Sequence, residues 1–140
     1  MIVQDKLIQV YMSIAESFSE LSPSRRSKVG CLIVKDDNII SFGYNGTPKK
    51  WDNNCEIEYA DGTLVTMDEV LHAESNAITK LAKSTLSSDN AIMFCTHSPC
   101  IHCAKLIHQA NISSYYYRNE YRDAAGLEFL NKVGVIVKKV

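Results

Sequence analysis

The sequence predicts an α/β protein in which helices cover both faces of one five-stranded mixed sheet, giving three layers, α/β/α. Two β-branched apolar runs separated by a short polar turn predict an antiparallel hairpin. In the second half of the chain, apolar strands alternate with segments of helical period, which is typical of parallel strands joined by right-handed crossovers. The 140 residues fit one domain spanning 1–140, because domains centre on roughly 100–150 residues.

The first half of the chain begins with a helix and continues with the hairpin. Apolar residues recur at helical spacing over 3–20, and Ser22-Pro23-Ser24 ends the period. The runs 29–34 and 39–44 are the two strands of the hairpin. Residues 49–69 are polar and show no clear period, so we expect a long loop, and long loops inside compact domains tend to be functional.

The second half alternates helices with strands. Helical spacing predicts helices over 70–81, 100–110 and 123–132. Apolar runs predict strands over 91–96, 112–117 and 133–137. Ser98 is the expected N-cap residue of the second of these helices, with Pro99 in its first position.

Charge and composition exclude several classes of protein. Lys and Arg number 15 and Asp and Glu number 16, so the net charge is −1, whereas proteins that bind long nucleic acids usually carry a basic surplus. The sequence has no run of about 20 apolar residues, the length that a membrane span needs. The five cysteines are an odd number and the first residues do not resemble an export signal, which argues against a secreted disulfide framework. We therefore expect a cytoplasmic protein whose partners include neither a membrane nor long nucleic acid.

Two short motifs carry the chemistry. His72-Ala-Glu74 opens one predicted helix, and Pro99-Cys100-Ile-His-Cys103 opens the next. Cys100 and Cys103 are three residues apart, so both thiols lie on one face of a helix. Two thiolates and the His72 imidazole make three zinc ligands and leave the fourth tetrahedral position open for water, as catalytic zinc sites do. Glu74 is then a proton shuttle beside that position and not a ligand.

Each cysteine also has a plainer interpretation. A Cys-x-x-Cys pair that opens a helix is typical of redox dithiols as well, but that interpretation leaves His72 and Glu74 unexplained. Cys31 and Cys95 lie in apolar strands and are expected to be small core residues. Cys55 lies in the polar loop and is either a plain thiol or a ligand of a second, structural zinc.

Other polar residues are open between a structural and a functional role. The three remaining histidines are expected at the surface or around the site, not as metal ligands: His97, His102 and His108. A basic cluster before the first strand is either a solvated turn or a phosphate-binding site: Arg25, Arg26 and Lys28.

Over about 24–137 the chain resembles the deoxycytidylate deaminases, a branch of the cytidine-deaminase-like zinc family, and in particular the small, phage-like members of that branch. The metal motifs mark the whole family, whereas the Gly-Tyr-Asn-Gly loop and the tail at 121–126 mark the nucleotide branch. The resemblance is carried by Val29-Gly-Cys-Leu-Ile-Val34, Gly43-Tyr-Asn-Gly-Thr-Pro48, Val70-Leu-His-Ala-Glu-Ser-Asn-Ala-Ile78, Ser98-Pro-Cys-Ile-His-Cys-Ala-Lys-Leu-Ile107 and Tyr121-Arg-Asp-Ala-Ala-Gly126.

The resemblance implies a cytidine-deaminase-like fold and zinc-dependent hydrolysis of dCMP to dUMP and ammonia, which supplies thymidylate synthesis. It implies that the three metal ligands hold a catalytic Zn2+ and that Glu74 is the catalytic residue. By position, Asn45 would hydrogen-bond the sugar hydroxyl, Arg26 would contact the 5′-phosphate, and Tyr121 would line the same pocket.

The resemblance also implies partners. It implies a homohexamer whose neighbouring subunits complete the pockets, and a location in the cytoplasm, or in the host cytoplasm if the source is a virus. Many family members are activated by dCTP and inhibited by dTTP, with Mg2+, and Gly43, Tyr44 and Gly46 would form that effector site.

Two other functions share these motifs. A deaminase that edits tRNA or single-stranded DNA uses the same zinc chemistry but normally presents a basic groove, and the net charge of −1 counts against it. A non-catalytic zinc-binding subunit is the other alternative. Glu74 argues against that alternative, because a closed structural zinc site needs no base.

Overall fold

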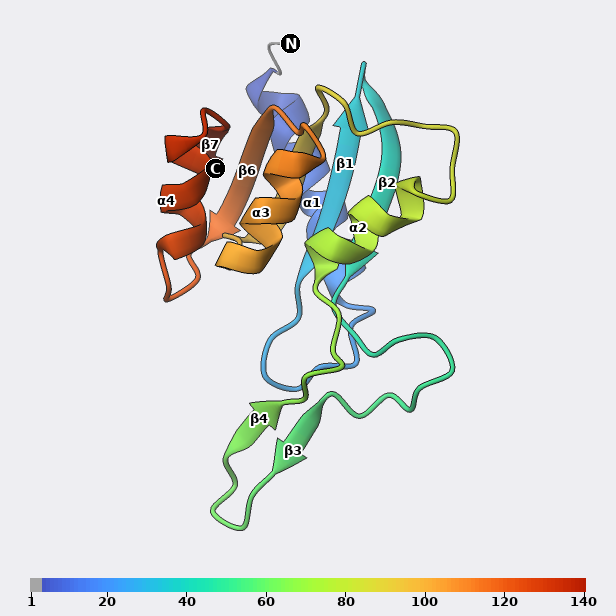
Figure 1. Cartoon of the computed structure of the whole chain (residues 1–140), viewed down its shortest axis with the longest axis vertical. Coiled ribbons are helices and arrows are strands. Elements are labelled where there is room, and N and C mark those ends of the chain that lie inside the picture. Colours follow the sequence, from blue (N-terminus) through green and yellow to red (C-terminus); the bar gives the residue numbers. More distant parts are fainter. Residues whose placement is uncertain (1–3) are drawn as a thin grey trace.

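The computed structural model describes residues 4–140, so the first position of the predicted 3–20 helix lies outside the described residues. Figure 1 shows the arrangement of the elements. In chain order they are α1 (Asp5–Ser19), β1 (Gly30–Lys35), β2 (Asn38–Tyr44), β3 (Glu56–Glu58), β4 (Leu64–Thr66), α2 (Ala73–Leu81), β5 (Ile92–His97), α3 (Ile101–Gln109), β6 (Ser114–Asn119), α4 (Ala125–Lys132) and β7 (Ile136–Lys139).

The main sheet has five strands in the order β2-β1-β5-β6-β7. β1 pairs antiparallel with β2 and with β5, while β6 runs parallel to β5 and to β7. The parallel pairs come from the second half, where α3 connects β5 to β6 and α4 connects β6 to β7. The predicted five-stranded mixed sheet is therefore confirmed, together with the antiparallel hairpin at its start.

Helices cover both faces of this sheet, and each face has its own hydrophobic core (Figure 1). Successive residues of a strand point to opposite faces, so β1 supplies Leu32 to one core and Ile33 to the other. α1 packs over Leu32 and Phe94, whereas α2, α3 and α4 pack over Ile33 and Met93. This is the three-layer α/β/α arrangement that the sequence predicts.

The stretch 49–69 is not the plain loop that the sequence predicts. It contains β3 and β4, which form an antiparallel pair of their own. The usual burial pattern is inverted in β3, because Glu56 is 1% exposed while Ile57 is 46% exposed. A search for buried apolar and exposed polar positions cannot find a strand of this kind.

The helix α2 begins at Ala73, not at 70 as predicted. Leu71 forms an isolated antiparallel bridge with Gly46, and the backbone stays extended up to the N-cap residue His72. The bridge therefore ties the start of α2 to the end of β2 and fixes where His72 emerges.

The helix α3 begins at Ile101, and its N-cap residue is Cys100. The predicted cap at Ser98 is therefore wrong, and the Ser98 hydroxyl accepts a hydrogen bond from the Tyr121 N–H at 2.6 Å. The other predicted boundaries differ from the observed ones by up to three residues. None of the helices within 4–140 combines the length and the apolar character that crossing a membrane requires.

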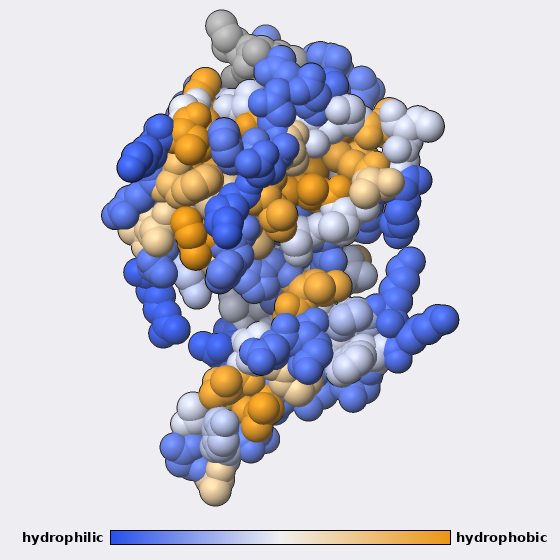
Figure 2. Space-filling view, in the orientation of Figure 1, coloured by the Kyte–Doolittle hydropathy of each residue, from blue (hydrophilic) through white to orange (hydrophobic). Residues whose placement is uncertain are grey.

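The hairpin of β3 and β4 projects away from the main sheet, at the bottom of Figure 1. Figure 2 shows apolar surface on this projection, and Ile57, Tyr59 and Val65 are each at least 40% exposed. Apolar surface that gathers in one place is typical of association surfaces.

Candidate active site

The start of α2 and the start of α3 meet on one face of the sheet (Figure 1). His72 immediately precedes α2 and Cys100 immediately precedes α3, and both residues have extended backbone. Cys103 lies in the first turn of α3. Because the N-terminal end of a helix carries partial positive charge, both helix ends favour thiolates over thiols.

The three predicted metal ligands come together at this point. Nδ1 of His72 lies 3.4 Å from Sγ of Cys100 and 3.3 Å from Sγ of Cys103. A tetrahedral zinc ion with ordinary Zn–N and Zn–S bonds separates the nitrogen from each sulfur by about 3.6 Å, so the spacing fits zinc. Within 4–140 this is the one group of His, Cys, Asp or Glu side chains placed to hold a metal ion. Cys55 is not part of it, and the second zinc has no ligand set among the described residues.

The side chains of this group alter one another's pKa. The Cys103 side chain and the His72 ring stabilise the Cys100 thiolate and lower its pKa to about 3. The Cys100 thiolate and burial in turn raise the pKa of Cys103, and the hydrogen bond with Cys100 raises the pKa of His72. The group therefore contains a thiolate, at Cys100, before any cation binds, and a bound zinc ion ionises its thiol ligands.

Glu74 lies in the first turn of α2 and is 4% exposed. The Tyr115 hydroxyl lies 3.2 Å from its Oε1 atom and the Cys95 thiol donates to the same atom at 3.7 Å. The Tyr115 hydroxyl also donates to the His97 carbonyl oxygen at 2.6 Å. Burial raises the pKa of Glu74, so this carboxyl group takes up a proton more readily than a solvated one. Such a group suits acid–base catalysis near neutral pH.

A close approach at Gly43 fixes α2 on the sheet. A Cβ atom at Gly43 would lie 2.2 Å from the carbonyl oxygen of Ala73 and 2.8 Å from the nitrogen of Ala77. The Cys31 thiol donates a hydrogen bond to the same Ala73 carbonyl at 3.2 Å. Since β1 and β2 thus contact the backbone of α2 directly, the sheet sets the position of Glu74.

A cavity of about 460 Å³ adjoins these groups. Six of the predicted site residues line it: Arg26, Asn45, His72, Glu74, Cys100 and Tyr121. Cys103 is almost completely buried and is not part of the lining. Among the other polar residues of the lining, His97 was expected around the site, whereas Thr66, Glu120 and Arg122 were not predicted. They come from β4, the end of β5 and the segment after β6, which only the fold brings to one place.

Two predicted substrate-binding residues have defined partners. Asn45 Oδ1 accepts a hydrogen bond from the Val29 N–H at 2.8 Å, and its Nδ2 donates to the Ser27 carbonyl at 2.8 Å. The Asn45 amide is therefore held in one orientation. Nη1 of Arg26 donates to the Thr66 hydroxyl at 3.0 Å, which directs the guanidinium group along the cavity wall.

The predicted effector residues do not line the cavity: Gly43, Tyr44 and Gly46. Gly43 packs against α2, and Gly46 forms the bridge with Leu71. The Tyr44 carbonyl accepts a hydrogen bond from Asn76 of α2 at 2.9 Å. These contacts connect the turn to α2, and the effector role stays a prediction.

The two cysteines expected in the core and the three remaining histidines lie as predicted. Cys31 and Cys95 are fully buried register partners in β1 and β5, which confirms them as core residues. His97 is partly buried in the cavity wall, and burial lowers its pKa, so its ring is neutral at pH 7. His102 and His108 do not belong to the metal-ligand group.

A carboxyl group that is withdrawn from solvent and placed next to three metal ligands is the arrangement of a hydrolytic zinc enzyme. The family follows from comparison with known proteins. The family model for the cytidine and deoxycytidylate deaminase zinc-binding region matches residues 5–119, and the chain belongs to this family.

Individual relatives agree with this assignment. The deoxycytidylate deaminase of Homo sapiens is 34% identical over 145 residues, covering 94% of this chain and 78% of the human protein. The deoxycytidylate deaminase of Saccharomyces cerevisiae is 30% identical over 92% of this chain, which spans 43% of the yeast protein. The crystal structure of dCMP deaminase from the cyanophage S-TIM5, in complex with dCMP and dUMP, matches with a TM-score of 0.92 at 45% identity. The match covers 99% of this chain and 100% of the phage chain, which confirms the predicted cytidine-deaminase-like fold.

Proposed function

We propose that this chain is a zinc-dependent deaminase that converts dCMP and water into dUMP and ammonia. The observation that carries the proposal is the cavity, whose lining combines His72, Cys100 and Glu74 with Arg26. A hydrolytic centre and a cationic side chain at the same cavity suit a phosphorylated nucleoside better than a free base. The phage deaminase that is similar over its whole length forms a complex with dCMP and dUMP, which supports this choice of substrate.

The reaction adds water to the ring carbon that bears the amino group and expels that group as ammonia. When bound by His72, Cys100 and Cys103, zinc supplies the acidity that makes water nucleophilic at neutral pH. Glu74 takes a proton from the attacking water, passes it to the adjacent ring nitrogen and later protonates the departing amine. Because Tyr115 contacts Oε1, the carboxyl group keeps one orientation during these transfers.

Other residues of the lining bind the rest of the nucleotide. Arg26 contacts the 5′-phosphate, and Arg122 supplies a second positive charge in the lining. Asn45 contacts the sugar hydroxyl, since an amide that makes two backbone hydrogen bonds keeps one donor and one lone pair. Tyr121 forms part of the wall beside them.

The test of this function is dCMP turnover by the zinc-loaded protein, with dUMP measured by chromatography and zinc by atomic absorption. Glu74→Gln keeps the shape of the side chain but cannot carry the proton, so we expect turnover to fall by at least about 100-fold while zinc content is unchanged. Glu128→Gln on the exposed side of α4 is the matched control and should keep full activity. Near-full turnover by Glu74→Gln would contradict the shuttle role.

The same measurement separates the two alternatives that the motifs allow. An editing deaminase should prefer a short tRNA hairpin or a single-stranded DNA oligonucleotide over dCMP in direct competition. The net charge of −1 and a cavity of about 460 Å³ favour the mononucleotide. A zinc-loaded protein without turnover on any cytosine or adenine substrate would instead be a non-catalytic subunit.

The proposal also covers how this chain, a single domain over residues 1–140, is regulated and how its copies assemble. dCTP with Mg2+ activates the enzyme and dTTP inhibits it at the turn of Gly43, Tyr44 and Gly46, whose hydrogen bond with Asn76 leads to the helix of Glu74. The chain forms a homohexamer, for which the exposed apolar residues of β3 and β4 offer a contact surface. It supplies dUMP for thymidylate synthesis in the cytoplasm, or in the host cytoplasm if the source is a virus. Rate curves that coincide with and without each effector would reject the effector site, and sedimentation as a monomer would reject the hexamer.

A further inference from the structure

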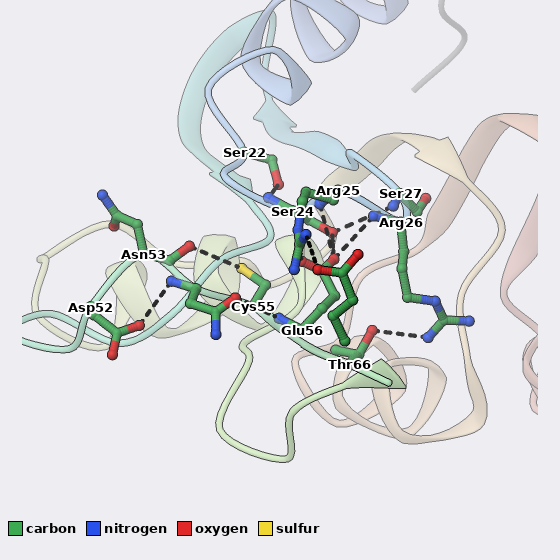
Figure 3. Close-up of polar contacts among 12 residues, drawn as sticks. Ser22, Ser24, Arg25, Arg26, Ser27, Asp52, Asn53, Cys55, Glu56 and Thr66 are labelled. Atoms are coloured by element: carbon green, nitrogen blue, oxygen red, sulfur yellow. Dashed lines mark hydrogen bonds and ion pairs between the residues drawn. The ribbon is translucent and has the colours of Figure 1, made fainter. Parts of the chain in front are cut away.

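A buried carboxylate of the hairpin lies against the loop that carries Arg26 (Figure 3). Glu56 of β3 is 1% exposed. Its Oε2 atom accepts a hydrogen bond from the Ser24 hydroxyl at 2.8 Å. The same atom accepts hydrogen bonds from the backbone N–H groups of Arg25 at 2.9 Å and Arg26 at 3.0 Å. Burial alone raises the pKa of Glu56, but these hydrogen bonds and the Arg25 charge outweigh burial and lower it. Glu56 is therefore ionised and fixes the backbone that leads into Arg26.

Thr66 holds the other end of Arg26. It is the register partner of Glu56 across β3 and β4, and its hydroxyl accepts the hydrogen bond from Arg26 Nη1 (Figure 3). One pair of facing residues therefore holds both the main chain and the guanidinium group of Arg26. Thr66 and Arg26 line the cavity and Glu56 does not, so Glu56 acts on the cavity only through Arg26.

The charges around this loop leave Arg26 available for an anion. Nε of Arg25 lies 3.7 Å from Glu56 Oε1, and Nη1 of Arg25 lies 3.6 Å from Glu58 Oε2. Glu56 Oε1 is buried without a hydrogen-bond partner among residues 4–140, so Arg25 is the charge that compensates it. Arg26 forms no ion pair within the described part of the chain. A phosphate group supplies the negative charge that the Arg26 guanidinium lacks.

We propose that the facing pair Glu56–Thr66 is a positioning element that makes the pocket selective for a nucleoside 5′-phosphate over the corresponding nucleoside. The inference rests on the proposed function, since it assigns Arg26 to the substrate phosphate. A guanidinium group that is held in place before binding loses less conformational freedom when it binds a phosphate. The phosphate takes no part in the reaction. Weaker binding of the phosphate by Arg26 therefore raises KM and leaves kcat nearly unchanged.

The experiment measures kcat and KM for dCMP and for deoxycytidine with the wild type, Glu56→Gln and Thr66→Val. Glu56→Gln weakens three charge-assisted hydrogen bonds and Thr66→Val removes the acceptor of the guanidinium group, while both keep the side-chain volume. We expect the ratio of kcat/KM for dCMP to that for deoxycytidine to fall by about tenfold in each variant, through the KM of dCMP. Glu58→Gln, on the same strand and in contact with Arg25 but not with Arg26, is the matched control and should keep the wild-type ratio.

A mutational cycle with Arg26→Gln separates positioning from a merely structural role. In the Arg26→Gln background, Glu56→Gln should change the selectivity ratio by less than about twofold, because the residue through which Glu56 acts is gone. A structural role would instead lower the activity on both substrates by the same factor. If Glu56→Gln fails to fold, as judged by its melting temperature, Thr66→Val supplies the decisive ratio.

The outcomes for the two proposals are distinct. A wild-type protein that deaminates dCMP, with variants that keep its selectivity ratio, would overturn the positioning role alone. A wild-type protein that does not deaminate dCMP would overturn the proposed function and this inference with it.

Discussion

Gly43 is the position at which one added methyl group should displace the helix that carries Glu74. In Gly43→Ala, the new Cβ atom would lie 2.2 Å from the carbonyl oxygen of Ala73 and 2.8 Å from the nitrogen of Ala77. Both atoms belong to the backbone of α2, so no side chain can rotate to relieve the contact. The helix as a whole must move away from β2, and His72 and Glu74 move with it.

The size of the effect follows from the contact distance. An ordinary contact between carbon and a carbonyl oxygen is about 3.3 Å, so α2 must retreat by about 1 Å. Overpacking of this kind lowers the free energy of unfolding by about 1–3 kcal/mol. A displacement of about 1 Å at the reacting groups lowers kcat/KM by about 100-fold. We expect Gly43→Ala to show both losses, together with weaker zinc binding.

The assay combines urea unfolding, zinc titration against a chromophoric chelator and dCMP turnover. Gly30→Ala is the matched control, because its Cβ atom would lie 2.2 Å from the carbonyl oxygen of Ala15 in α1, which carries none of the metal ligands. The control should lose a similar free energy of unfolding and keep its zinc affinity. The reasoning is refuted if Gly43→Ala retains wild-type stability and turnover, or if Gly30→Ala loses as much zinc affinity as Gly43→Ala.

Three further predictions concern buried polar groups and the metal. Tyr115→Phe removes the hydroxyl beside Glu74 and should lower kcat about tenfold, with zinc content unchanged. It should also lower the free energy of unfolding by about 1–2 kcal/mol. A kcat within twofold of the wild type would contradict this prediction. Because the folded-state pKa of Glu56 is lowered, its stabilising effect is complete above the ordinary Glu pKa of about 4.3 and is lost as pH falls through the folded value. Urea unfolding should therefore find the wild type more stable than Glu56→Gln at pH 7, with the difference closing in acid, and a constant difference would count against the linkage. Removal of zinc with a chelator should abolish turnover and lower the melting temperature, and added Zn2+ should restore both; turnover that persists after chelation would exclude a catalytic zinc.

The fold was predictable where apolar side chains are buried and polar side chains are exposed. The strands β1 and β5 are continuous buried apolar runs and the helices each bury one face, and both are signals that hydrophobic patterns detect. The hairpin of β3 and β4 was missed because Glu56 points inward and Ile57 points outward, the reverse of that pattern. The start of α2 was misplaced because the bridge between Leu71 and Gly46, two residues far apart in the chain, keeps the backbone extended. Such contacts are properties of the folded chain and leave no periodic signal.

The metal-ligand group was predictable because its spacing is set by local geometry. His72 and Glu74 share one helix start, and Cys100 and Cys103 share another, so only one tertiary contact has to be assumed. The cavity wall is different, because Thr66 and Arg122 come from separate segments with ordinary surface composition. Glu56 shows the limit most plainly, since its role depends on three donors that converge on one oxygen.

The most direct test of the central claim is the ranking of substrates by kcat/KM for the zinc-loaded protein. The panel is dCMP, CMP, dCTP, deoxycytidine and adenosine in a short tRNA hairpin, with ammonia and product measured together. We predict that dCMP ranks first and yields dUMP and ammonia in equal amounts, because the cavity combines the deaminase centre with Arg26. A first rank for deoxycytidine or for the tRNA hairpin, or the absence of dUMP, would contradict the account.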